Sequence, residues 1–223
     1  KTHMLPLLDS EIGIHLQTAL SDLGLEFWEN KTPRKISRIN NKARVEFTDD
    51  TSIESDVLLY ALGREANVDS LNINNAGIEV SQRGYIPVNP LFQTAQTHIY
   101  AVGDVIGGPS LASTGMEQGR LAMRHACGRK TNYFPELFPL GIYTIPEIST
   151  CGATEEALKE KGIHYEVGRA YYYEIARSHI SGDSVGLFKI IFHSETLEIL
   201  GIHVIGRGAT EVIHIGQVAM SFN

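Results

Sequence analysis

The residues with the clearest chemical potential follow a short apolar segment near the middle of the chain. Residues 98–102 predict a strand that runs directly into Gly103-Asp104, and a helical pattern begins after Pro109-Ser110. An aspartate at the carboxyl end of a strand lies where α/β folds bind ligands. Its carboxylate can accept charge-assisted hydrogen bonds from the hydroxyls of a sugar or ribitol. The free amides that open the next helix can donate to an electron-rich ligand, so this order predicts a nucleotide-cofactor site.

A second glycine-containing loop imitates a dinucleotide-binding motif. Gly206-Arg207-Gly208 follows a predicted strand and opens a predicted helix. The third glycine of that motif is missing, however, and the preceding strand belongs to a predicted hairpin and not to a βαβ unit. We therefore interpret residues 206–211 as a packed strand-to-helix turn.

Several histidines and arginines are further candidates with simpler interpretations. His193, His203 and His214 lie close together in the sequence but lack metal-ligand spacing, so no metal site is expected. Arg169 and Arg177 offer positive charge to a nucleotide phosphate, although a solvated surface is the commoner setting for such side chains.

The composition limits the classes of function. The chain has 223 residues, of which 43% are hydrophobic and 20% are charged, enough for a sizeable core. Its net charge of −7 argues against nucleic-acid binding and against a basic membrane-surface helix. No run approaches the roughly 20 apolar residues of a membrane helix. The two cysteines, Cys127 and Cys151, make no disulfide framework, so we expect a cytoplasmic location.

Hydrophobic periodicity predicts an α/β region followed by an α+β region. A first helix is expected between the cap Asp9-Ser10 and the stop Gly24. Further helices are expected at about 110–127 and 154–161, and in a closing helix that carries Val212, Ile213, Ile215 and Met220. Strands are expected at 25–28, 34–39, 43–47, 51–53, 56–61, 98–102, 163–173, 186–193 and 198–205. Asn40-Asn41 suits a hairpin turn because asparagine tolerates positive φ.

Four blocks of the chain match a known family in order. Gly63-Arg64 with Asn67 resembles a Gly-Arg-x-x-Asn turn, although Glu65-Ala66 stands where a proline usually precedes the Asn. Residues 94–104 resemble a second flavin motif, and residues 143–148 and 201–211 resemble an interface domain. Together these blocks resemble the flavoprotein disulfide-reductase family, the class I pyridine nucleotide-disulfide oxidoreductases.

The resemblance implies a partial two-dinucleotide-binding-domain flavoprotein of the α/β class with Rossmann-like halves, followed by an α+β interface domain. It places the C-terminal part of the NAD(P)-binding domain at 1–93, the C-terminal part of the FAD-binding domain at 94–135, and a truncated dimerisation domain at 136–223.

The same resemblance implies roles for individual residues. Gly103 and Asp104 would hold the FAD ribitol, and Gly63 and Arg64 would line the cleft between NAD(P) and FAD. The backbone at the start of the next helix would face the flavin pyrimidine edge, at Leu111, Ala112 and Ser113. No metal is implied, and no catalytic residue is expected in this chain.

Details around the flavin motif distinguish branches of the family. Disulfide reductases commonly have Leu-Ala-His and then Glu-Gly, where this chain has Leu111-Ala112-Ser113 and Gln118-Gly119. That variant is similar to the transhydrogenase members. The resemblance implies an NAD(P)⁺ transhydrogenase of the Si-specific type, in which FAD passes hydride between NADPH and NAD. NADP and NADH would be the products, and the protein would be a homodimer or a larger homo-oligomer.

Other family motifs do not occur in this sequence. There is no usable Gly-x-Gly-x-x-Gly and no Cys-x-x-x-x-Cys pair. We therefore expect a fragment that lacks the first half of the flavin site and the C-terminal tail, and we expect it to be inactive alone. Two alternatives stay open. One is a disulfide reductase of the dihydrolipoamide dehydrogenase kind. The other is a non-catalytic dimerisation fragment, whose self-interface would consist of the strand before the closing helix and the apolar face of that helix, Val212, Ile213, Ile215 and Met220.

Overall fold

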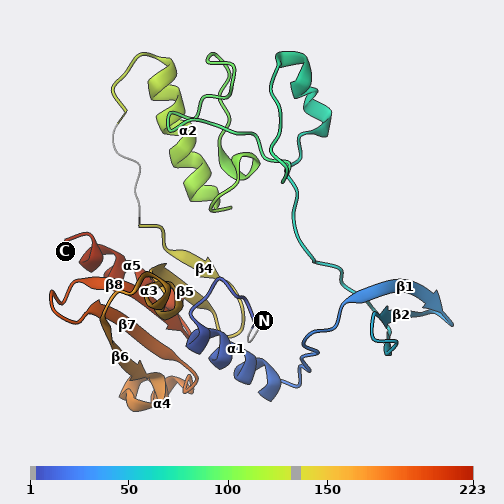
Figure 1. The fold of residues 1–223 in the computed structure, drawn as a ribbon. Helices are drawn as coiled ribbons and strands as arrows, with labels where there is room; N and C mark the ends of the chain where they lie inside the picture. Colours follow the sequence, from blue (N-terminus) through green and yellow to red (C-terminus); the bar gives the residue numbers. More distant parts are fainter. Residues whose placement is uncertain (1–3, 132–136, 223) are drawn as a thin grey trace. The chain divides into compact units, whose positions relative to one another are not determined.

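The computed structural model describes residues 4–131 and 137–222 (Figure 1). Their contacts form two compact units, one of residues 1–57 with 136–223 and one of residues 58–135. The boundary expected near Phe134-Pro135 lies outside the described residues. The division at residues 93 and 135 that the resemblance implies stays a prediction.

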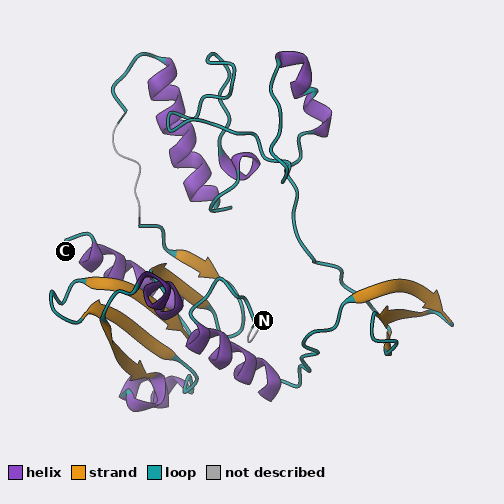
Figure 2. Cartoon of the chain, in the orientation of Figure 1, coloured by secondary structure: helices purple, strands orange, loops and turns teal. Residues whose placement is uncertain are grey.

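The larger unit is built on a five-stranded antiparallel sheet with strand order β4-β5-β8-β7-β6 (Figure 2). Its strands are β4 (Leu140–Ile142), β5 (Ile148–Gly152), β6 (Tyr165–Tyr171), β7 (Leu187–His193) and β8 (Ile199–Ile205). Its α-helices are α1 (Ser10–Asp22), α3 (Glu155–Lys161), α4 (Ala176–Ser181) and α5 (Ala209–Met220), and a 3₁₀ turn covers Tyr172–Glu174. The expected strands after residue 160 and the closing helix are confirmed, whereas β4, β5 and α4 had not been predicted.

The central strand β8 is covered on both faces. Ile202 and Val204 pack in one apolar cluster with Ile213 of α5, and Ile205 packs in another with α1. Because successive side chains of a strand point to opposite faces, this alternation places α1 and α5 on opposite faces of the sheet. A strand covered on both faces reads as a nearly continuous apolar run, as residues 199–205 do apart from His203.

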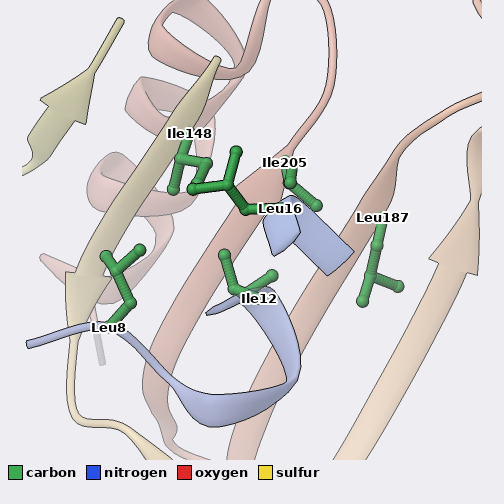
Figure 3. Packing of buried hydrophobic residues seen from close by; sticks show 6 residues of the cluster. All are labelled: Leu8, Ile12, Leu16, Ile148, Leu187 and Ile205. Carbon is green, nitrogen blue, oxygen red and sulfur yellow. The ribbon is translucent and has the colours of Figure 1, made fainter. Parts of the chain in front are cut away.

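Helix α1 packs on the sheet through one apolar stripe (Figure 3). Leu8, Ile12 and Leu16 contact three strand residues in that cluster, and all six side chains are buried. The strand residues are Ile148, Leu187 and Ile205. Asp9 caps the helix by accepting a hydrogen bond from the amide of Glu11, as its position before the apolar pattern predicted.

Two local predictions are confirmed closely. The hairpin consists of β1 (Pro33–Ile39) and β2 (Lys42–Phe47), extended by β3 (Ser52–Ser55). Asn40 and Asn41 form its turn with φ of 49° and 66°. Both turn residues therefore adopt the left-handed conformation that asparagine tolerates.

The smaller unit has little regular structure besides helix α2 (Ala112–Ala126). Short 3₁₀ turns occupy Asp69–Leu71, Ile73–Ala76 and Gly103–Ile106. Its core consists of Val68, Ile78, Ile86 and Ala101. Across both units, none of the described helices is long and apolar enough to cross a membrane.

Three of the predicted strands are wrong. Residues 25–28 and 56–61 have no strand structure, and Val57, Leu59 and Tyr60 are exposed. Residues 98–102 contribute only an isolated bridge between Tyr100 and Gln93. The physical reason is the same in each case: a strand needs a hydrogen-bonding neighbour, and the described residues provide none that extends along these segments.

One buried histidine of the sheet is expected to make the stability of the fold depend on pH. His203 of β8 is fully buried; its Nδ1 lies 2.5 Å from the Thr150 hydroxyl and its Nε2 lies 3.0 Å from the Ala153 carbonyl oxygen. Burial lowers the pKa of His203 below its ordinary value of 6.5, so the folded protein holds this ring neutral.

We predict that stability falls as the pH drops below about 6.5, because the unfolded chain then binds a proton that the folded His203 does not. The slope for one such proton is about 1.4 kcal/mol per pH unit. His203→Gln should flatten the dependence of the urea midpoint on pH between about pH 7 and pH 5. His214→Gln, a change at an exposed position of α5, should keep the wild-type slope. An unchanged slope in His203→Gln would contradict the prediction.

Candidate functional site

The candidate site lies in the smaller unit, where the backbone reverses between residues 101 and 108. Val102 is extended, and Gly103 has a φ of 79° that favours glycine. Asp104 therefore sits half exposed in the first turn of the 3₁₀ segment, three positions after the buried Ala101.

Helix α2 packs closely against this turn. A Cβ on Gly115 would lie 3.3 Å from the Cα of Gly103, so the two glycines allow a backbone approach that larger residues would hinder. The buried Gln118 side chain accepts a hydrogen bond of 2.7 Å from the Gly103 amide. The helix thus fixes the backbone that carries Asp104.

Arg64 and Asp104, both predicted site residues, form an ion pair across 40 positions of sequence. The Arg64 guanidinium donates to Asp104 Oδ2 at 2.7 Å. Both side chains are well exposed, and exposed pairs contribute about 1 kcal/mol or less. The pair orients the Asp104 carboxylate but leaves it able to accept further hydrogen bonds, because Oδ1 has free lone pairs for another donor.

The N-terminus of α2 offers hydrogen-bond donors close to this loop in sequence. Leu111 is its extended N-cap residue and no side chain caps the helix, so the amides of Ala112 and Ser113 keep their donors available. The buried Thr114 hydroxyl has no hydrogen-bond partner among the described residues. The site therefore offers a carboxylate acceptor and uncapped helix amides to a polar ligand.

Gly63 precedes Arg64 in an exposed loop. Its φ of 145° is strained for other residues, and a Cβ there would meet no atom within 4 Å. Its surroundings are thus open on the side where a side chain would stand, which fits the predicted close approach of a ligand to the backbone.

Hydrogen-bond donors in the loop at residues 206–211 already have a partner within the protein. Glu147 accepts hydrogen bonds from the Gly208 amide and, at 2.8 Å, from the Thr210 hydroxyl. The Glu147 carbonyl accepts from the Gly206 amide at 2.9 Å. An internal carboxylate therefore occupies the N-terminus of α5, which agrees with our interpretation of a packed turn.

The three candidate histidines lie in separate hydrogen-bonded settings. His193 Nδ1 accepts from the amides of the β7–β8 turn, and His214 contacts Gln217 within α5. His203 is buried in β8 as described above. Each ring thus has a local partner in the sheet, the turn or the helix.

The two candidate arginines differ from each other. Arg169 Nε donates to both carboxylate oxygens of Glu11, at 2.8 and 3.1 Å, in a bifurcated contact that the sequence had not indicated. Arg177 lies exposed on α4, as expected of a solvated side chain. Arg169 is thus engaged within the larger unit.

Sequence reasoning missed a buried polar cluster in the larger unit. Lys189 is fully buried among the carboxylates of Asp9, Glu11 and Glu155. A usable signal was present, because Lys189 interrupts the apolar run from Leu187 to Phe192.

Two family models match the chain. One, described as pyridine nucleotide-disulphide oxidoreductase, matches residues 1–119. The other, described as the dimerisation domain of the same family, matches residues 138–223.

Curated relatives match along nearly the whole chain. Proteins named soluble pyridine nucleotide transhydrogenase from Serratia proteamaculans and Escherichia coli are each 45% identical over 221 residues. A protein of the same name from Mycobacterium bovis is 44% identical over 220 residues. These alignments cover 99% of this chain but only 47–48% of each relative, so the chain spans about half their length.

Solved structures confirm the fold class. The flavoprotein disulfide reductase RclA from Escherichia coli superimposes with a TM-score of 0.91 and 28% identity, covering 99% of this chain and 51% of that protein. LpdA from Mycobacterium tuberculosis gives a TM-score of 0.86 and 26% identity, covering 96% and 47%. With one family model covering more than half of its residues and a second covering most of the rest, the chain belongs to the pyridine nucleotide-disulphide oxidoreductase family.

Proposed function

We propose that this chain supplies the second half of an FAD site in an enzyme that transfers hydride between NADPH and NAD. The observation that carries the proposal is the arrangement in the smaller unit. The turn with the half-exposed Asp104 packs on α2 through Gly103, and α2 begins without a side-chain cap.

Each group has a defined role in this proposal. Asp104 accepts hydrogen bonds from ribitol hydroxyls, and Arg64 keeps its carboxylate oriented. The backbone of Leu111, Ala112 and Ser113 donates to the pyrimidine edge of the flavin. Gly103 and Gly63 allow close approach of their backbones to the ligand.

FAD, when bound, would supply the hydride chemistry, accepting from one nicotinamide nucleotide and returning to the other. The protein's contribution is binding and electrostatics. The positive end of the α2 dipole favours negative charge at the pyrimidine edge, which increases on reduction. No side chain of this chain is assigned a proton-transfer role.

Relatedness favours the transhydrogenase branch over the disulfide reductases. Relatives named transhydrogenase are 44–45% identical, against 26–28% for the superimposed LpdA and RclA. A full-length sequence with a Cys-x-x-x-x-Cys pair would instead favour the disulfide reductases, because a transhydrogenase needs no redox disulfide. The Si-specific assignment and a reducing, cytoplasmic location belong to the same proposal.

The function is tested on a full-length protein that contains this sequence. We expect NADPH to reduce an NAD analogue in the presence of FAD, with no reduction of lipoamide by NADH. Lipoamide reduction without hydride transfer between the two nucleotides would favour the disulfide reductase alternative. The 223-residue chain alone should catalyse neither reaction, because it carries only half of the proposed site.

For the flavin site we predict that Asp104→Asn weakens FAD binding by the full-length protein about 10- to 100-fold. The reason is that charge-assisted hydrogen bonds contribute about 1.5–3 kcal/mol each. Titration of the apoprotein with FAD, followed by quenching of flavin fluorescence, measures the change. Asp69→Asn removes an equal charge from an exposed 3₁₀ turn of the same unit and should bind FAD normally. Equal affinities of the two variants would contradict the role of Asp104.

We further propose that a second copy of the chain binds at α5. The sequence had suggested Val212, Ile213, Ile215 and Met220 as a self-interface, but Ile213 and Met220 are buried against the chain's own sheet. Ile215 is 75% exposed and Val218 is 56% exposed. These two residues lie three positions apart on one helical face, and the matching family model is named a dimerisation domain.

Ile215→Lys should therefore shift this chain towards monomer, because burying an unpaired ammonium in an apolar interface is unfavourable. Ile180→Lys is a matched control, since Ile180 is equally exposed on α4 at 80%. Analytical ultracentrifugation over a range of concentrations measures both association constants. A dimer that persists in Ile215→Lys, or one that Ile180→Lys disrupts equally, would argue against α5 as the interface.

A further inference from the structure

A buried lysine lies in the sheet of the larger unit. Lys189 occupies β7 between Leu187 and Ile191, which are core residues on the same face, and its side chain has no exposed surface. An ammonium group removed from water is stable only when opposite charges and hydrogen bonds replace its hydration. The partners of Lys189 therefore determine what can pack on this face.

Three carboxylates surround this ammonium. Lys189 Nζ lies 2.7 Å from Asp9 Oδ1, 2.9 Å from Glu11 Oε2 and 2.5 Å from Glu155 Oε1. Asp9 and Glu11 open α1, and Glu155 opens α3. Although burial opposes both shifts, these contacts raise the pKa of Lys189, and the pKa of Glu155 falls to about 2 with help from the Tyr165 hydroxyl.

The two helix N-termini also cap each other. Asp9 accepts from the Glu11 amide in its own helix at 3.1 Å and from the Glu155 amide of α3 at 3.2 Å. In return, Glu156 of α3 accepts from the Ser10 amide of α1 at 3.3 Å. Each helix therefore satisfies a free amide of the other, with 146 residues of chain between them.

The positive charge of Lys189 offsets the repulsion among the three carboxylates. The ligand atoms of Asp9, Glu11 and Glu155 lie within 4.8 Å of one another, a spacing that would suit a metal ion. The ammonium of Lys189 contacts all three carboxylates and so occupies that position. Without it, only the partly exposed Arg169, 2.8 Å from Glu11 and 3.7 Å from Glu155, would offset the repulsion among the three carboxylates, and Asp9 would have no cation beside it.

We propose that Lys189 is the centre of an ionic latch that holds the N-terminus of α1 on the dimerisation domain. The latch consists of Lys189, Asp9, Glu11 and Glu155. Helix α1 lies within the residues matched by the oxidoreductase model, and Lys189 and Glu155 lie within those matched by the dimerisation model. The latch thus joins the two parts of the family architecture at one buried charge and positions α1 on the sheet.

The test is amide hydrogen exchange on the 223-residue chain, comparing α1 with β8. Lys189→Ala should accelerate exchange in α1 on the order of 100-fold, while β8 keeps more of its protection, because the unpaired carboxylates repel α1 from the sheet. Lys159→Ala is the matched control: Lys159 contacts the same Glu155 at 3.4 Å but is 66% exposed. Its exchange should match wild type.

A rescue experiment separates the latch from a general packing defect. In Lys189→Ala the three carboxylates remain and can bind a divalent cation in place of the ammonium. Millimolar Mn²⁺ should restore protection of α1 in this variant and leave wild type unchanged. A variant that only lost packing would show no response to Mn²⁺, which would overturn the proposal.

If Lys189→Ala does not fold, the same hydrogen-exchange comparison on Asp9→Asn tests the latch. Asparagine keeps the N-cap of α1 but removes the anion that faces Lys189. Faster exchange in α1 than in β8 supports the latch. Protection of α1 equal to wild type overturns it.

Discussion

The larger unit depends on how the charge of one ammonium is neutralised inside it. Lys189 has no access to water, and removing one partner of a buried pair costs about 3–5 kcal/mol, a large fraction of the stability of a domain. That cost holds both helices against the sheet, because the start of α1 supplies two of the carboxylates and α3 supplies the third. The apolar stripe of Leu8, Ile12 and Leu16 then determines which face of α1 meets the sheet.

The candidate site of the smaller unit differs from this cluster, since several of its polar groups remain available to a ligand. Asp104 is half exposed, α2 has no side-chain cap, and the Thr114 hydroxyl lacks a partner among the described residues. Buried polar groups in folded proteins nearly always have hydrogen-bond partners. A ligand with hydroxyls for Asp104 and acceptor atoms for the helix amides would give these groups hydrogen-bond partners. For this reason we place the proposed FAD site in the smaller unit.

Local sequence rules predicted the elements whose stability is local. The asparagine turn, the Asp9 cap of α1 and the apolar alternation of β7 and β8 each follow from residues within a few positions. Strands at 56–61 and 98–102 were predicted wrongly because an apolar run specifies a strand only when neighbouring strands pair with it. In the candidate site, Asp104 and the start of α2 were predictable from their order in the sequence. The pairing of Asp104 with Arg64 and of Lys189 with Asp9 spans 40 and 180 positions, and spacing carries no signal for it.

The N-termini of α2 and α5 both follow glycine-containing loops, and comparing them shows what distinguishes a candidate cofactor site from a packed turn. Gly206-Arg207-Gly208 before α5 imitates the glycine pattern of a dinucleotide loop, whereas Gly103-Asp104 before α2 lacks that pattern. At α5 the carboxylate of Glu147 already accepts from the Gly208 amide and the Thr210 hydroxyl, so an incoming phosphate would have to displace an internal anion. At α2 the candidate-site carboxylate, Asp104, is paired with Arg64, and no side chain caps the helix. The capacity to bind a cofactor therefore depends less on the glycine pattern than on whether the chain has already satisfied the amides that the pattern exposes.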